Sequence, residues 1–246
     1  IGPVRSSRHY FLDYALENDA IYVHYGWSPQ AQYDISNLGV NNINGISESE
    51  SSFWRVKDKR APHNVATSTA KILSIAERKG YKTTSTKESV LKYVTDEVEL
   101  TDGQSAEKIT IPYSYSNDVE YTYDATTKRY QRYSKGVKET DWSTGENITT
   151  KNIIITFAKN SVLNDGENKD RQTLSNIGTL NGYYITNGKA IKITCEKTSR
   201  SAQTVYKDLD GNEIKVNDGN TYVQICPINA KVTIEGAEET VTEDVD

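Results

Sequence analysis

The apolar residues of this 246-residue chain follow two different periodicities along its length. In residues 1–92 they recur at helical spacing between short apolar runs, which predicts helices alternating with strands. From residue 106 onward they alternate with polar residues, which predicts antiparallel strands joined by tight turns. We therefore expect an α+β protein, in which an N-terminal α/β-type domain with helices packed on a small sheet precedes a mainly antiparallel β domain. The expected divisions are a domain over 1–92, a linker over 93–105, a β-rich domain over 106–236 and an acidic tail over 237–246.

Capping residues and glycine stops predict three helices in the N-terminal domain. The second should begin directly after Ser28 and end at Gly39. The third should follow a cap at Thr67 or Ser68 and end at Gly80. Strands are predicted over 20–26, where an apolar and aromatic run indicates burial on both faces, and over 53–56.

The first predicted helix carries its charges in an unfavourable order. It is expected within Val4–Asp19, with Ser6 or Ser7 as N-cap, so that Arg5 and Arg8 crowd its start and acidic residues follow toward its end. The helix macrodipole favours the opposite order, by about 0.3–1 kcal/mol per exposed charge. Two interpretations stay open. The arginines point to water or pair with an internal carboxylate, or they bind an anionic ligand.

Tight-turn signals recur through the second half of the chain. Hairpins are predicted over 121–132, 183–194 and 206–216. The last two have turns at Asn187–Gly188 and Asp210–Gly211. The apolar run 152–157 predicts a central buried strand, and a short helix is expected near 170–175.

Charge and cysteine content exclude several classes of protein. The formal net charge is −5 and no polybasic stripe occurs, so binding of nucleic acid through its phosphates is not expected. No run approaches the roughly 18 apolar residues of a membrane span. Cys195 and Cys226 are too few for a disulfide framework, and buried free thiols are expected unless an extracytoplasmic location allows one bridge.

The 17 tyrosines suit half-exposed strand surfaces and could also recognise partners or glycans.

Basic and imidazole side chains gather at segments that precede predicted helices. All three histidines, His9, His24 and His63, lie in the first 63 residues. His24 stands near the carboxyl end of the strand at 20–26, a common position for ligand sites in α/β sheets. If the helix starts converge, guanidinium, imidazole and backbone N–H groups would form a pocket for phosphate, sulfate or carboxylate. The predicted ligand-binding residues are Arg5, Ser6, Arg8, His24, Gly26, Arg55, His63 and Asn64.

Other interpretations of these residues remain open. His24 could equally be a core histidine bonded to the backbone, or His24 or His63 could be the acid or base of an envelope hydrolase or transferase. The three histidines could form a zinc site only without the spacing of a known zinc motif. Ser6 or Ser7 could pair with His24 as nucleophile and base, but neither serine stands in a G-x-S-x-G elbow. Phosphate-loop and dinucleotide motifs are also missing, so no metal or cofactor is expected and enzymatic activity is left undecided. A third interpretation makes the chain a protein-interaction scaffold that docks through its β-rich half.

Several runs together resemble the YerB-like bacterial lipoproteins, a two-domain family of unknown function. The runs are 1–29, 53–55, 61–64, 121–132, 150–152, 210–214 and 219–225. The resemblance implies a membrane-anchored, extracytoplasmic protein of Gram-positive-type bacteria, with an α/β or α+β domain followed by a β-rich one. It implies no activity.

The resemblance also covers most of the predicted site. Arg5, Ser6 and Arg8 match the family's R-S-x-R motif, His24 and Gly26 match its H-x-G, and residues 62–64 match its P-H-N. The family usually begins earlier, with a lipid-attachment cysteine that this chain does not include, so contact with a membrane is expected only through such an anchor. The expected partners are an anionic or polar ligand and a protein docking to the β-rich domain.

Overall fold

The computed structural model describes residues 1–167 and 169–236, which form two compact units. Of the described residues, the first unit contains 1–90, 161–167, 169–177 and 197–204, and the second contains 91–160, 178–196 and 205–236. The sequence pattern placed 161–177 and 197–204 in the β-rich domain, whereas the structure packs both segments into the first unit. The predicted acidic tail, 237–246, lies outside the described residues.

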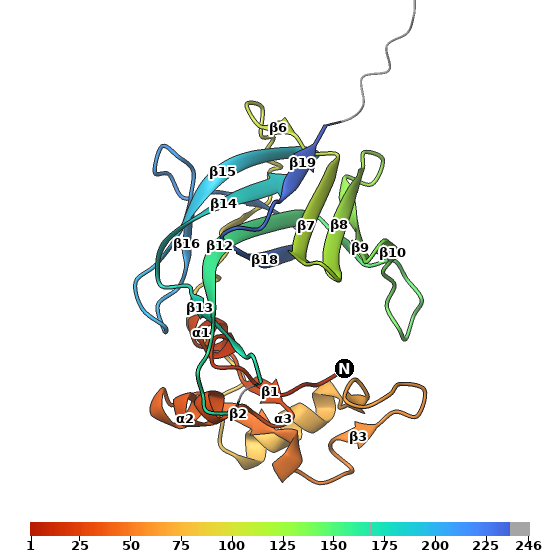
Figure 1. The fold of residues 1–246 in the computed structure, drawn as a ribbon, viewed down its shortest axis with the longest axis vertical. Helices are drawn as coiled ribbons and strands as arrows, with labels where there is room; N and C mark the ends of the chain where they lie inside the picture. Colours follow the sequence, from red (N-terminus) through yellow and green to blue (C-terminus); the bar gives the residue numbers. More distant parts are fainter. Residues whose placement is uncertain (168, 237–246) are drawn as a thin grey trace, which may run out of the picture. The chain divides into compact units, whose positions relative to one another are not determined.

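The first unit combines three helices with two small two-stranded sheets (Figure 1). Strands β1 and β2 pair in parallel, and β3 and β4 pair antiparallel. Its elements are α1 (Phe11–Glu17), β1 (Tyr22–His24), α2 (Pro29–Asn37), β2 (Asn42–Asn44), a 3-10 turn (Gly45–Ser47), β3 (Trp54–Arg55), β4 (Val65–Ala66), α3 (Thr69–Arg78) and β13 (Gln172–Ser175). Its main core contains Val4, Ile43, Phe53, Val65, Ile75 and Ala76.

Helices α2 and α3 form where the capping pattern predicts them. The Ser28 hydroxyl accepts from the backbone N–H of Ala31 at 3.3 Å, and the Ser68 hydroxyl accepts from that of Lys71 at 3.3 Å. Both helices are followed closely by a glycine of positive φ, Gly39 and Gly80, which a residue with a Cβ would adopt only with strain.

The predicted start of the first helix is wrong. Helix α1 begins at Phe11, after Tyr10, and no side chain caps it. The segment before it is extended, because the backbone N–H of Ser7 donates to the Gly26 carbonyl at 2.9 Å and that of Tyr25 donates to the Arg5 carbonyl at 2.9 Å. Ser7 therefore pairs with a strand end instead of capping a helix. Both arginines precede α1, and the Arg8 carbonyl accepts from the backbone N–H of Phe11 at 3.2 Å, at the start of the helix.

The acidic residues of α1 are neutralised by bases far along the chain. Asp13 accepts from Arg200 Nε at 2.6 Å, and the same guanidinium donates to Asp34 of α2 at 2.7 Å. Glu17 accepts from Lys197 Nζ at 2.8 Å, with both side chains almost fully buried. These ion pairs fasten segment 197–204 to the two helices of the first unit.

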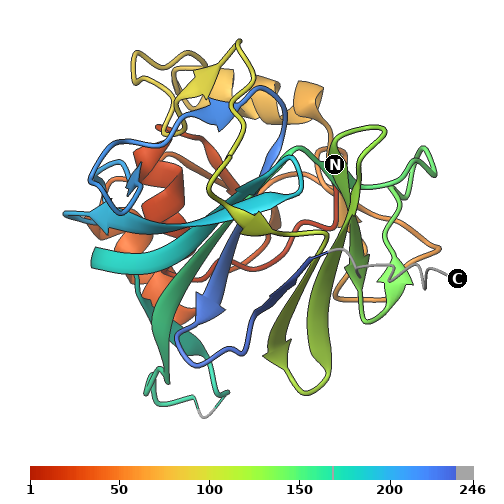
Figure 2. The ribbon, with the colours of Figure 1, turned by 90° about the horizontal axis from the view of Figure 1, so that it is seen from above.

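The second unit is built mainly from antiparallel strand pairs (Figures 1 and 2). Its strands are β5 (Tyr93–Val94), β6 (Gln104–Ser105), β7 (Lys108–Ser114), β8 (Asn117–Asp124), β9 (Arg129–Ser134), β10 (Val137–Lys138), β11 (Thr149–Thr150), β12 (Asn152–Val162), β14 (Gly178–Thr186), β15 (Lys189–Lys197), β16 (Val205–Lys207), β17 (Val216–Asn217), β18 (Thr221–Pro227) and β19 (Thr233–Glu235). Among these described strands, two pairs are parallel. One sheet has the order β10-β9-β8-β7-β19, with β11 paired to β9. In the other, β12, β14, β15 and β16 are successive neighbours, β18 pairs with β12, and β6 pairs with β15. A further pair joins β5 to β17.

The central strand predicted at 152–157 is confirmed. It lies within β12, which pairs with β14 on one side and β18 on the other, and Ile153, Ile154 and Ile155 are all fully buried. The hairpins at 121–132 and 183–194 also form. The short helix predicted near 170–175 is wrong, because residues 172–175 form strand β13. Cys195 and Cys226 are buried free thiols. The α+β class with an antiparallel second half is confirmed.

Candidate functional site

Four of the predicted site residues form two contacting pairs. The Arg5 guanidinium lies 2.8 Å from His63 Nδ1 and 3.0 Å from Nε2, and Arg55 donates to Asn64 at 2.7 Å. The pairs come together because the backbone N–H of Val4 donates to the Val65 carbonyl at 2.8 Å, which joins the extended first segment to strand β4. Arg5, Arg55 and His63 are exposed.

Arg8 and Ser6 form a local contact. Arg8 Nη1 donates to the Ser6 hydroxyl at 2.9 Å and to the Ser7 carbonyl at 2.9 Å. The guanidinium therefore folds back on its own segment and holds it in shape.

His24 is a core residue. Its side chain is fully buried, its Nδ1 lies 2.9 Å from the Gly26 carbonyl, and its Nε2 lies 3.1 Å from the Asn42 amide oxygen. Its ring stacks on Tyr22 and packs against Trp27. With both nitrogens occupied and no exposed surface, it is placed to order the turn at Gly26, not to touch a substrate.

The third histidine lies elsewhere in the first unit. His9 Nε2 lies 2.9 Å from the Thr173 hydroxyl, and burial lowers the pKa of the imidazole. In the described part of the chain, no group of three or more histidine, cysteine or acidic side chains could hold a metal ion.

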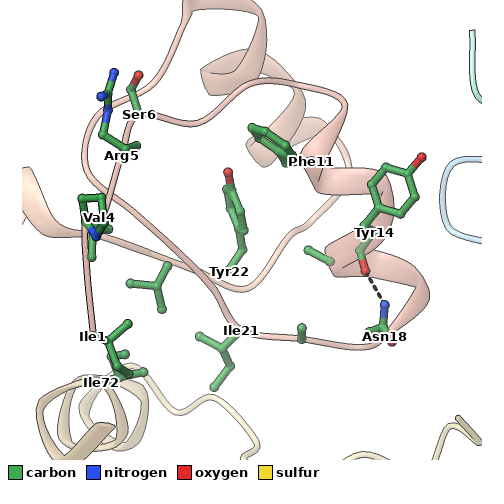
Figure 3. Close-up of a pocket in the computed structure, with 14 residues that line it drawn as sticks. Ile1, Val4, Arg5, Ser6, Phe11, Tyr14, Asn18, Ile21, Tyr22 and Ile72 are labelled. Atoms are coloured by element: carbon green, nitrogen blue, oxygen red, sulfur yellow. Dashed lines mark hydrogen bonds between the residues drawn. The ribbon is translucent and has the colours of Figure 1, made fainter. Parts of the chain in front are cut away.

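A cavity of about 630 Å³ opens beside Arg5 and Ser6 (Figure 3). Most of its wall is apolar. Arg5 and Ser6 lie at one end in Figure 3, and Ile1 and Ile72 lie at the other. The lining residues are Ile1, Pro3, Val4, Arg5, Ser6, Phe11, Tyr14, Ala15, Asn18, Ala20, Ile21, Tyr22, Val23 and Ile72. The cavity lies within the size range of small-molecule sites, about 300–1,000 Å³.

The polar groups of this wall are few, and its one charged side chain, Arg5, lies at one end beside Ser6 (Figure 3). Among the residues that the structure describes, Arg5 takes part in no ion pair, so its positive charge is not cancelled within the protein. Tyr22 projects between Arg5 and Phe11, and burial raises the pKa of its phenol, which therefore remains neutral and can donate a hydrogen bond. Such a cavity can hold an apolar body while its mouth holds an anionic group.

Of the eight predicted ligand-binding residues, Arg5 and Ser6 line this cavity, and the sequence analysis did not predict its apolar wall. Ile21 and Val23 stand at alternate positions of the predicted strand at 20–26, and Phe11 belongs to the apolar side of the first helix. The sequence signal of these residues is that of ordinary core positions. Only the structure reveals that Phe11 is 47% exposed and faces a hollow.

None of the helices in residues 1–167 and 169–236 has both the length and the hydrophobicity needed to cross a bilayer.

Comparisons with known proteins match both halves of the chain. Residues 1–82 match the N-terminal domain, and residues 109–223 the C-terminal domain, of DUF3048, described as a protein of unknown function. The chain is 30% identical over 235 residues to the "Putative lipoprotein YerB" of Bacillus subtilis strain 168, covering 92% of this chain and 67% of that protein. It also superposes on the crystal structure of B. subtilis YerB with a TM-score of 0.81 and 28% identity, covering 95% of this chain and 77% of the other.

Proposed function

The chain belongs to the DUF3048 family of YerB-like proteins of unknown function, and on that premise we propose that its N-terminal domain binds an anionic amphiphile in the cavity beside Arg5. The observation that carries the proposal is a guanidinium without an acidic partner in the described chain, placed at one end of a mainly apolar cavity.

The two parts of the cavity would contribute in different ways. Burying the apolar body of a ligand against Phe11, Ile21 and Ile72 contributes about 25 cal/mol for each Å² removed from water. Arg5 offers planar N–H donors that suit a carboxylate or phosphate, and its contact with the His63 ring helps to hold the guanidinium in place. The apolar part supplies most of the affinity, and Arg5 selects the head group.

A location at a membrane surface would supply such ligands. The B. subtilis relative is named as a lipoprotein. We extend that description to this protein as part of the proposal: it acts as an extracytoplasmic, membrane-anchored module of the envelope of a Gram-positive-type bacterium, where acyl chains with anionic head groups are abundant.

Isothermal titration calorimetry with octanoate tests the proposal. We expect binding with a Kd of about 1 mM or tighter. Ala20→Phe should abolish binding, because Ala20 is exposed on the cavity wall and the larger ring would fill the space without disturbing the core. Arg55→Gln is the matched control, since this exposed arginine bonds to Asn64 and does not line the cavity.

Binding that is equal in the parent and in Ala20→Phe would contradict the proposal, provided that circular dichroism shows the variant to be folded. Absence of octanoate binding to the parent would contradict it as well.

A further inference from the structure

A second cavity, of about 390 Å³, lies entirely within the β-rich unit and has a very different wall. Strands β8, β9, β10 and β11 and the segments beside them form it, and its lining is almost wholly polar or aromatic. The lining residues are Thr122, Tyr123, Asp124, Thr127, Arg129, Gln131, Tyr133, Lys138, Asn147 and Thr149. We propose that this cavity binds an oligosaccharide that carries an acidic group.

The register of the strands shows which face the cavity occupies. Tyr121 of β8 and Tyr130 of β9 are fully buried in the core of the unit. Side chains alternate along a strand, so Thr122, Gln131 and Tyr133 project from the opposite face. In that face Thr122 pairs across to Gln131, and Tyr133 pairs across to Lys138. Most of the lining thus lies on the outer face of a sheet whose inner face is a packed core, and Tyr123 of the inner face, which packs on Tyr130, also lines the hollow.

Part of the wall is held rigid by internal hydrogen bonds. Gln131 Nε2 donates to three backbone carbonyls, those of Arg132, Glu139 and Ile148, at 2.8–3.2 Å. Arg129 Nε donates to the Thr149 hydroxyl at 2.8 Å. These bonds fix the strands around the hollow before any ligand arrives, which reduces the cost of ordering on binding.

Another part of the wall has free hydrogen-bonding groups. In the described chain the side chains of Thr122, Tyr133, Lys138 and Asn147 have no hydrogen-bond partner, and Lys138 has no ion pair. They offer a hydroxyl, a phenol, an ammonium and an amide to one shared space. A ligand that is rich in hydroxyl groups can use all four at once.

The chemistry of the wall favours a sugar over other small ligands. The wall contains no leucine, isoleucine, valine or phenylalanine, and its apolar surface comes from tyrosine rings and from the carbon atoms of polar side chains. The ring of Tyr133 gives a flat apolar surface with a polar tip, on which the C–H face of a pyranose can pack. Arg129 and Lys138 contribute two positive charges against the single carboxylate of Asp124, which favours a sugar with a carboxylate or phosphate.

Calorimetry on the full chain with two matched tetrasaccharides tests the inference. The acidic probe is tetragalacturonate and the neutral probe is the glucose tetramer. We expect tetragalacturonate to bind more tightly than the glucose tetramer. Tyr133→Ala should weaken both by about fivefold or more. Lys138→Gln, at an exposed position that leaves the fold intact, should remove most of the preference for the acidic probe.

Two control variants show whether sugar binding depends on this cavity in particular. Tyr115 is a fully exposed tyrosine of the same unit, outside the cavity, so Tyr115→Ala should bind both probes as the parent does. Arg5→Gln should also leave sugar binding unchanged. That outcome would show that the sugar does not bind at the cavity beside Arg5 in the N-terminal domain. The inference is overturned if the parent binds neither tetramer, if it prefers the neutral one, or if affinity is the same in the parent, Tyr133→Ala and Lys138→Gln.

Discussion

The buried ion pair between Glu17 and Lys197 gives a sharp prediction about the stability of the N-terminal domain. The side chains are 4% and 2% exposed, and the same Glu17 oxygen also accepts from the Thr204 backbone N–H at 3.1 Å and hydroxyl at 2.7 Å. Lys197→Met keeps the length of the side chain but leaves a carboxylate buried without its cation. Breaking a buried pair from one side costs roughly 3–5 kcal/mol. At about 4 °C per kcal/mol, the Tm of this unit should fall by about 10–20 °C.

Tryptophan fluorescence can report this unit alone. Trp27 and Trp54 both lie in the first unit, so a Trp142→Phe background removes the tryptophan of the second unit. Thermal and urea unfolding are then followed in the parent background and with Lys197→Met added. Unit-specific detection matters because a two-unit chain need not unfold in one step.

A double variant and a surface control isolate the contribution of the ion pair. Adding Glu17→Gln to Lys197→Met removes the unpaired charge while the Thr204 contacts can persist, so the double variant should be at least about 1 kcal/mol more stable than Lys197→Met alone. Lys192→Met changes an exposed lysine of the same strand and should change stability by less than about 0.5 kcal/mol. A loss under about 1 kcal/mol for Lys197→Met, or singles that simply add in the double variant, would refute this reasoning.

Three further predictions concern other parts of the fold. Burial raises the pKa of Cys195 and of Tyr121 from 9.0 and 10.0 to about 12. The unfolded chain therefore holds fewer protons than the folded one between about pH 9 and 12, so the free energy of unfolding should fall as pH rises through this range. Cys195→Val should make this fall with pH less steep. A urea midpoint that stays constant up to about pH 11 would contradict the prediction. Gly182→Ala should abolish folding of the β-rich unit, because the added Cβ would lie 2.1 Å from the Ile155 carbonyl oxygen across the strand pair. A soluble variant with the circular dichroism spectrum of the parent would contradict this prediction. Ser28→Ala should lower the free energy of unfolding of the first unit by about 1 kcal/mol through loss of the α2 cap, as measured by urea unfolding. An unchanged free energy of unfolding would show that the cap is not needed.

Features set by neighbouring residues could be predicted from the sequence. The caps at Ser28 and Ser68 and the glycines after α2 and α3 are local signals, and the structure follows them. The turn at Asn187–Gly188 likewise joins β14 to β15, since both residues take the positive φ that this turn requires.

Features set by distant residues could not be predicted. Helix α1 begins late because Ser7 bonds to Gly26, far along the chain, instead of capping the helix. Segment 197–204 joins the first unit because Arg200 and Lys197 find carboxylates in α1, at the opposite end of the sequence. A periodic pattern contains no information on which distant charge will find which partner.

In the candidate site, too, some features could be predicted from the sequence and others could not. That Arg5 and His63 lie together agrees with the predicted gathering of basic groups, but His24 lies inside the core, where its ring is held by the turn and by Asn42. The sequence motif contains no sign of this difference, because an H-x-G at a strand end serves equally well for a ligand site or for a packed turn. The apolar wall of the cavity was missed because its residues also suit a core.

The most direct test of the central claim, that Arg5 selects an anionic head group at the mouth of an apolar cavity, is a comparison of octanoate with 1-octanol. The two ligands share the same apolar chain, so their affinity ratio isolates the head group. We predict that the parent prefers octanoate by about fivefold and that Arg5→Gln binds both equally. Equal affinities in the parent, or an octanoate preference that survives in Arg5→Gln, would contradict the claim.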